Sequence, residues 1–206
     1  MRIDNPTRAV FAAFCLVTGC LSRPGLDQQT FVFAPTARSA PVGAAGGRAL
    51  GIRSLRVAAP FEGRAFVYRT GEFAYKRDPY AAFMVSPGDG LGPAISGWWR
   101  AAGGFREVVD GGSALKANTL VEIQVRELYG DFRPPETPAA VLNLRFVFFD
   151  APNGVPGKVL LEREYLRRVA LKTRTAGAVI EGWNEALAQI LESSMLDFGR
   201  LETNAP

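Results

Sequence analysis

Hydrophobic and polar residues alternate most regularly between residues 119 and 169. Such alternation is typical of strands that have one buried face and one exposed face. The pattern predicts strands over residues 119–129, 139–150 and 158–169, separated by segments that contain Pro and Gly. Because these strands follow one another directly, we expect three consecutive antiparallel strands.

Two stretches have apolar residues at helical spacing instead. Residues 90–101 predict a helix that ends at Gly103-Gly104. Residues 175–198 predict a longer helix, which Thr175 can cap and Gly199 closes. The apolar stripe of this second helix consists of Val179, Ile180, Trp183, Leu187, Ile190, Leu191 and Met195.

The first half of the chain has shorter strand patterns. They cover residues 49–59, 65–69 with 73–75 as a hairpin, and 105–109, whereas residues 78–87 look irregular. Together with the later elements, these predict an α/β or α+β fold: a single mixed or antiparallel sheet with two main helices packed on it.

Residues 21–48 are rich in Pro, Ala, Gly and Ser, a composition that favours a flexible tether. Gln29–Phe33 is a strand-like island within it, and if this island pairs, the folded part starts there. The expected division is therefore 1–19 as a signal peptide, 20–48 as a tether, 49–199 as the domain and 200–206 as a tail.

The amino-terminal residues have the parts of a secretory signal. Arg2 and Arg8 precede an uncharged apolar run over residues 9–17, which is much shorter than the roughly 20 residues that span a bilayer. Val17-Thr18-Gly19-Cys20 then resembles a bacterial lipobox. This resemblance implies cleavage before Cys20 and acylation of its sulfur. The alternative is an uncleaved apolar helix with a buried cysteine.

Composition removes several kinds of chemistry. Cys15 and Cys20 are the only cysteines, and the chain has no histidine. A mature chain that starts at Cys20 would have one lipidated thiol, so it could form no internal disulfide. We expect no metal site and no cofactor. The net charge of +4 is spread along the chain, which does not favour a nucleic-acid partner.

Candidate catalytic groups lack the partners they need. The serines have no histidine base and no Gly-x-Ser-x-Gly elbow. Glu162 and Glu164 alternate with Arg163, as exposed strand faces commonly do. Residues 88–92 are Gly-rich but lack the Lys-Ser/Thr pair of a phosphate loop. We therefore expect a protein that is not an enzyme.

Aromatic residues are the remaining candidates for a functional surface. Trp98 and Trp99 are adjacent on the first predicted helix, so we expect one to pack and the other to lie near the surface or in a contact. The alternative is a helix that is buried on two sides. With Phe83 and Tyr80, these tryptophans are candidate contacts to a partner protein or an acyl chain.

A loose motif, Phe66-Val67-Tyr68-Arg69 followed by Tyr75, lies between the lipobox and the predicted helices. The order of these features over residues 50–198 resembles the ABC-type transport auxiliary lipoproteins, the group that contains the paraquat-inducible protein C-like lipoproteins. Members often have Trp-Ala near Ala82-Phe83, and this chain departs from them there.

The resemblance implies an anticodon-binding-like sheet in a non-catalytic periplasmic lipoprotein. It also implies partners: an ABC permease and ATPase, and an MCE (mammalian cell entry) protein that moves lipid between the inner and outer membranes. Some members form rings. Leu21-Ser22 after the cysteine lack the aspartate that retains enterobacterial lipoproteins in the inner membrane, which favours the outer membrane. The alternative function is a structural or assembly lipoprotein of the envelope.

Overall fold

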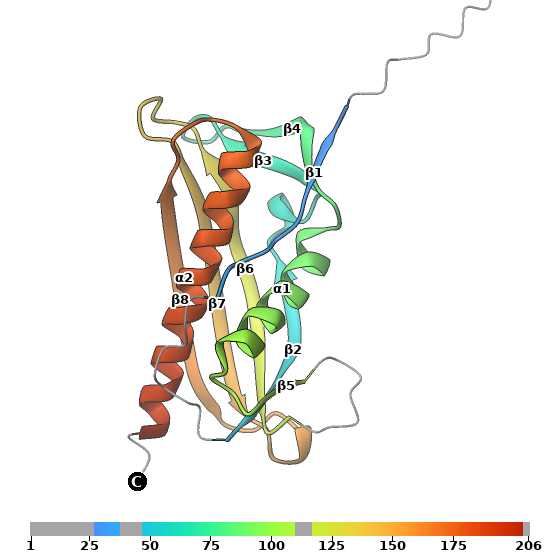
Figure 1. Cartoon of the computed structure of the whole chain (residues 1–206), viewed down its shortest axis with the longest axis vertical. Coiled ribbons are helices and arrows are strands. Elements are labelled where there is room, and N and C mark those ends of the chain that lie inside the picture. Colours follow the sequence, from blue (N-terminus) through green and yellow to red (C-terminus); the bar gives the residue numbers. More distant parts are fainter. Residues whose placement is uncertain (1–26, 38–46, 110–116, 204–206) are drawn as a thin grey trace, which may run out of the picture.

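The structure, a computed structural model, describes residues 27–37, 47–109 and 117–203. These residues form one open sheet of eight strands with two helices packed on the same face (Figure 1). This architecture confirms the expected fold class. Cys20 and the signal segment lie outside the described residues.

The longest strands of the sheet are β6 (Thr119–Asp131), β7 (Ala139–Asp150) and β8 (Val159–Ala170), and β8 is an edge strand. They pair in sequence order and antiparallel, as predicted. Val121, Ile123 and Val125 of β6 are buried. The alternation in the sequence therefore marks which face of the sheet the helices cover.

Two shorter strands lie end to end along the other side of β6. They are β2 (Ala49–Val57) and β3 (Ala65–Arg69), both parallel to β6, and the short helix η1 (Ala59–Phe61) connects them. β5 (Glu107–Val109) extends the sheet beside β2. β4 (Tyr75–Phe83) pairs antiparallel with β3, so the sheet is mixed.

β4 corrects the expectation that residues 78–87 are irregular. The sequence of β4 does not alternate between polar and apolar residues. Exposed charged residues come first, and the buried Ala81, Ala82 and Phe83 come last. Pro79 is an unusual residue within a strand, but the β3–β4 register shifts between Ala65 and Val67, opposite this stretch. A bulge tolerates a proline because no ladder N–H is needed there.

Both predicted helices are present. α1 (Pro87–Ala102) begins at Ser86, whose Oγ accepts a hydrogen bond from the Asp89 N–H, and ends at the left-handed Gly103. α2 (Ala176–Thr203) is capped by Thr175, whose Oγ1 accepts from the Ala178 N–H. The prediction that Gly199 closes α2 is wrong. A closing glycine needs a positive φ, and Gly199 has none.

The strand-like island near the amino terminus forms β1 (Gln29–Phe31), which pairs parallel with the end of β4. Residues 32–37, here called the strap, then run across the helical face (Figure 1). The Ala34 N–H donates to Asn184 Oδ1 of α2. The Phe33 ring stacks on Phe83 with centroids 4.8 Å apart. The folded part therefore includes residues ahead of β2.

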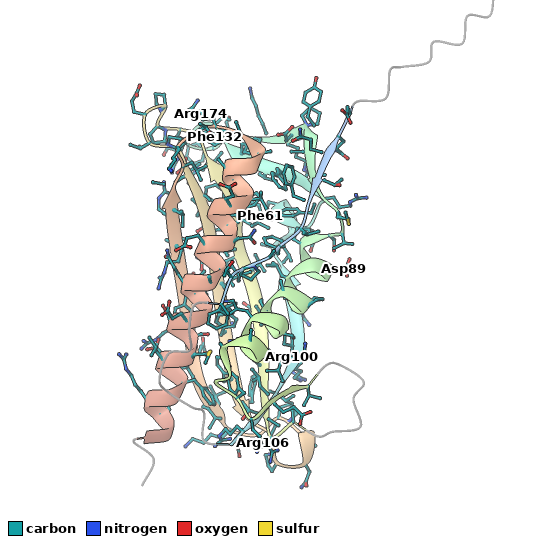
Figure 2. All side chains as sticks on the ribbon, viewed as in Figure 1. Phe61, Asp89, Arg100, Arg106, Phe132 and Arg174 are labelled. Atoms are coloured by element: carbon teal, nitrogen blue, oxygen red, sulfur yellow. The ribbon has the colours of Figure 1, made fainter. Side chains whose placement is uncertain are left out.

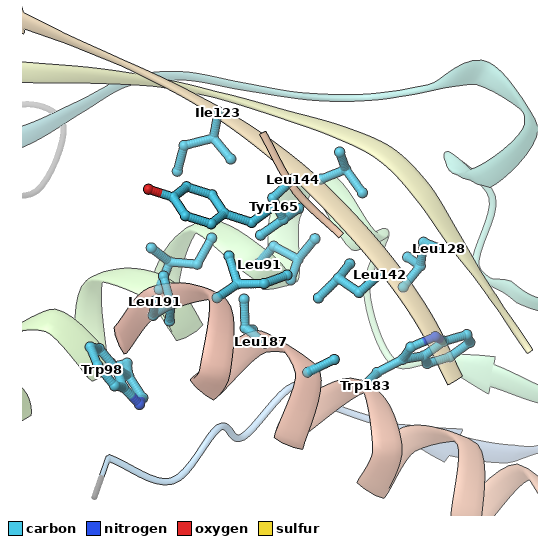
Figure 3. Close-up of a cluster of buried hydrophobic side chains, with 14 of the residues drawn as sticks. Leu91, Trp98, Ile123, Leu128, Leu142, Leu144, Tyr165, Trp183, Leu187 and Leu191 are labelled. Carbon is cyan, nitrogen blue, oxygen red and sulfur yellow. The ribbon is translucent and has the colours of Figure 1, made fainter. Parts of the chain in front are cut away.

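The core lies between the two helices and the sheet, and Figure 3 shows part of it. Trp183 of α2 is fully buried, and its indole N–H donates to the backbone oxygens of Tyr129 and Val141. Its ring contacts Phe66 and Phe83. A single side chain of α2 thus joins β3, β4, β6 and β7.

Candidate functional site

The structure places the four aromatic candidates unequally. Trp99, Trp98 and Phe83 are 0, 4 and 3% exposed, whereas Tyr80 is 57% exposed. The expectation that one tryptophan lies near the surface is wrong, because α1 is buried on two sides. Trp99 contacts Phe146 of the sheet, and the indole N–H of Trp98 donates to the Thr36 oxygen of the strap. Of the four, Tyr80 alone presents its ring in this conformation.

Three segments far apart in sequence meet at one end of the sheet, where β3 turns into β4. Arg69 is in register with Asp131, Asp131 with Ala139, and Ala139 with Ala170. We call this the hairpin end and define it as residues 68–78, 130–138 and 168–175. Figure 2 shows Phe132 and Arg174 there.

A buried carboxylate organises the hairpin end. The Asp131 side chain is fully buried and accepts hydrogen bonds from Arg133 Nη2 at 2.7 Å and from Arg168 Nη2 at 2.8 Å. Arg133 Nε also donates to it, at 2.9 Å. These hydrogen bonds hold the pKa of Asp131 well below its ordinary value against the opposing effect of burial. They fasten the β6–β7 loop to β8.

A second set of contacts links the loop before α2 to β4 through the same end. Arg174 donates to the Phe132 oxygen and lies over the Phe132 ring, 5.3 Å from its centroid. The Phe132 ring stacks on Tyr68, and the Tyr68 hydroxyl donates to Asp78 Oδ2 at 2.7 Å. Burial, followed by this hydrogen bond, raises the pKa of Tyr68 far above its ordinary value. The three segments are therefore fixed to one another.

The tip of the β3–β4 hairpin carries Phe73, whose side chain is 88% exposed. Backbone hydrogen bonds from Thr70 and Gly71 to the Ala74 oxygen close this turn. Arg69 Nη2 donates to the Glu72 oxygen at 2.7 Å. Phe73 is thus held outward by an ordered turn. The expectation that Phe73 belongs to the second strand of the hairpin is wrong, because β4 begins only at Tyr75 and Phe73 lies in the turn, facing solvent.

The hairpin end is basic. Its three segments contain seven Lys and Arg residues against four Asp and Glu residues. One of those carboxylates, Asp131, is already buried between two arginines. Lys76, Arg77 and Lys172 are exposed. The hairpin end as a whole therefore carries an excess of positive charge.

The face of the sheet opposite the helices carries paired charges instead. Arg145 pairs with Glu162, Arg126 with Glu164, and Arg53 with Glu122. Glu162 and Glu164, which were considered as a carboxylate pair, each bind an arginine on this partly exposed face. Ion pairs between neighbouring strands are what an exposed sheet face commonly contains.

The described residues hold no cluster of three or more His, Cys, Asp or Glu side chains that could bind a metal ion. An open groove of about 550 Å³ lies between the end of β8 and the start of α2, lined by Leu171, Thr175 and Glu181 among others. In the part of the chain that the structure describes, no helix is long and apolar enough to cross a membrane.

Comparison with known proteins relates the fold to solved structures. No protein-family model and no curated protein matches the sequence. Protein XCC0632 from Xanthomonas campestris, described by the family model DUF330, superposes with a TM-score of 0.69 at 17% identity, over 85% of this chain and 100% of that chain. An uncharacterised protein superposes with a TM-score of 0.56 at 14% identity, over 81% and 97%.

A PelC dodecamer from Paraburkholderia phytofirmans gives a TM-score of 0.45 at 14% identity, over 75% of this chain and 91% of that chain. A likeness this weak carries no argument about assembly. The two better superpositions show that other proteins share this fold.

Proposed function

We propose that this chain is a lipoprotein of the cell envelope, held at the periplasmic face by lipid on Cys20. It acts there as a non-catalytic accessory subunit of an ABC/MCE-type system that moves lipid between the inner and outer membranes. Its partners are the MCE-domain protein and the ABC permease and ATPase. The lipobox-like Val17-Thr18-Gly19-Cys20 supports the lipid attachment.

The observation that carries the proposal is the arrangement of the motif behind the family resemblance. Arg69 of β3 and Tyr75 of β4 are cross-strand partners, and the Arg69 guanidinium lies 5.7 Å from the centroid of the Tyr75 ring. Tyr68, between Val67 and Arg69, stacks on Phe132. The residues of the motif therefore contact one another or the neighbouring loop, which supports a structural role for the motif on which the resemblance rests.

Copurification after mild crosslinking tests the partners. A tagged chain and a Cys20→Ala variant, which cannot be acylated, would be isolated from membranes and analysed by mass spectrometry. We expect the unaltered chain to recover an MCE-domain protein and an ABC permease, and the variant to recover much less of both. Recovery of outer-membrane assembly proteins alone would favour the envelope-assembly alternative and overturn the transport role.

Membrane fractionation tests the location. With Leu21-Ser22 after the cysteine, we propose attachment to the outer membrane. Leu21→Asp should then move the chain to the inner-membrane fraction, while Ser22→Ala should leave it in place. If the unaltered chain is already found in the inner membrane, the outer-membrane assignment is wrong.

A further inference from the structure

The pairing of β1 limits how far the folded chain can lie from Cys20. Gln29 is already paired with β4, so residues 21–28 are the only link between Cys20 and the sheet. Eight residues reach at most about 29 Å in any conformation. A fold starting at residue 49 would have had a link of 28 residues, with a limit of about 100 Å. The described fold is therefore held much closer to its attachment point.

The link also leaves the fold in a defined direction. β1 is parallel to β4, with Gln29 opposite Ala81, and Gln28 Nε2 donates to the Pro79 oxygen at 3.2 Å. The amino-terminal end of β1 therefore lies on the side of this pairing that leads along β4 toward Tyr75. The four residues from Pro79 to Tyr75 cover about 13 Å. A link of up to about 29 Å is long enough to reach the tip.

The surface that faces this direction is the hairpin end. Phe73 is its most exposed large apolar residue, at 88%, and Tyr75 and Tyr80 are 46 and 57% exposed. Lys76 and Arg77 are exposed beside them. An aromatic tip with exposed basic side chains close to it in the same hairpin complements the headgroup region of an anionic membrane, where the ring buries apolar area and the cations meet phosphates.

We propose that the hairpin end rests on the membrane that holds Cys20, with Phe73 inserted at the level of the headgroups and Lys76 and Arg77 on anionic phosphates. This inference rests on the proposed lipid attachment of Cys20. In this orientation the long strands β6, β7 and β8 run from the hairpin end away from the membrane surface. Val155, 64% exposed and close to the start of β8 at the other end of the sheet, is then among the residues farthest from the lipid.

Fluorescence of a single attached dye tests this contact on the mature chain, acylated at Cys20 and otherwise complete. Because both natural cysteines lie at or before residue 20, a chain acylated at Cys20 and cleaved before it has no free thiol. Phe73→Cys and the control Val155→Cys would each be labelled with an environment-sensitive dye. The two proteins would be reconstituted on vesicles of phosphatidylcholine with phosphatidylglycerol. Spin-labelled lipid then reports contact by quenching.

We expect a blue-shifted emission and at least about twofold stronger quenching at position 73 than at position 155. The double variant Lys76→Glu, Arg77→Glu should lower the quenching at position 73 toward that of the control. If position 73 is no better quenched than position 155 while the protein floats with the vesicles, the inference is overturned and the lipid attachment stands. If mass spectrometry finds no acyl chain on Cys20, the attachment itself fails, and the inference falls with it.

Discussion

The indole N–H of Trp98 donates a hydrogen bond to the backbone oxygen of Thr36, 3.2 Å away. This bond joins α1 to the strap, two parts of the chain separated by 62 residues. It explains how a helix can carry two adjacent tryptophans that are both buried. The sheet covers Trp99, and the strap lies over the side of α1 that carries Trp98.

Removal of the Phe33 ring should loosen the strap. Phe33 stacks on Phe83, whereas its neighbour Val32 is 53% exposed. We expect Phe33→Ala to lower the free energy of unfolding by about 2 kcal/mol, somewhat less than for a fully buried phenylalanine. Val32→Ala should change it by less than about 0.5 kcal/mol. Urea unfolding followed by tryptophan fluorescence measures both, and equal effects would show that the strap contributes no stability.

Neutralising Asp131 should make stability less dependent on pH. Its folded pKa is lowered by Arg133 and Arg168, so the stabilisation is fully present above the unfolded pKa of about 4. It is lost as the pH falls below that value, toward the folded pKa. At pH 7 we expect Asp131→Asn to cost about 2–3 kcal/mol, because both arginines keep some contact with solvent.

Urea unfolding at several pH values between neutral and about 3 follows this loss. The difference in the free energy of unfolding between the unaltered protein and Asp131→Asn should become smaller as the pH falls. Glu136→Gln, on the exposed part of the same loop, serves as the control and should have little effect at any pH. If this difference in the free energy of unfolding does not change with pH, the ionised carboxylate of Asp131 is not what stabilises the fold.

Substitution by alanine should have opposite effects on stability at two glycines of α2. A Cβ on Gly182 would lie 2.6 Å from the Ala140 Cβ of β7 and 2.8 Å from the Leu171 side chain, so the helix would have to move off the sheet. A Cβ on Gly177 would meet nothing within 4 Å. We expect Gly182→Ala to destabilise the fold by about 1–3 kcal/mol and Gly177→Ala to stabilise it by up to about 1 kcal/mol.

Thermal unfolding measured by circular dichroism compares the two glycine variants directly. A raised midpoint for Gly177→Ala beside a lowered midpoint for Gly182→Ala is the expected pattern. If Gly182→Ala proves as stable as the unaltered chain, α2 does not pack on β7 as closely as the structure shows.

The elements that the sequence predicts well are those whose pattern is local. β6, β7 and β8 alternate because one face of each is covered by helices, and α2 has its apolar stripe for the same reason. The hairpin of β3 and β4 was predicted, but β4 was given only its first residue, Tyr75, because the next residues are charged on both faces. The burial of Trp98 was not predicted because the strap that covers it lies 62 residues earlier in the sequence. The periodicity of apolar residues within a helix gives no information about such a distant contact.

The hairpin end could not be predicted from the sequence for a similar reason. Its basic residues come from three segments that only the register of β3, β6, β7 and β8 brings together. The exposure of Phe73 depends on the closed turn around it and on the lack of a covering loop among the described residues. A phenylalanine that directly follows Thr-Gly-Glu in a predicted turn was the available signal. Acylation of Cys20 stays a prediction.

The bond from the Ala34 N–H to Asn184 spans 150 residues of sequence. A ribosome or an export channel releases the chain from its amino terminus, so the strap emerges early and waits for its partner until α2 has followed. β1 likewise has to wait for the end of β4. Such long-range closures come late in folding. β1 and the strap would then be among the last parts of the described fold to pair, after β4 and α2 have emerged.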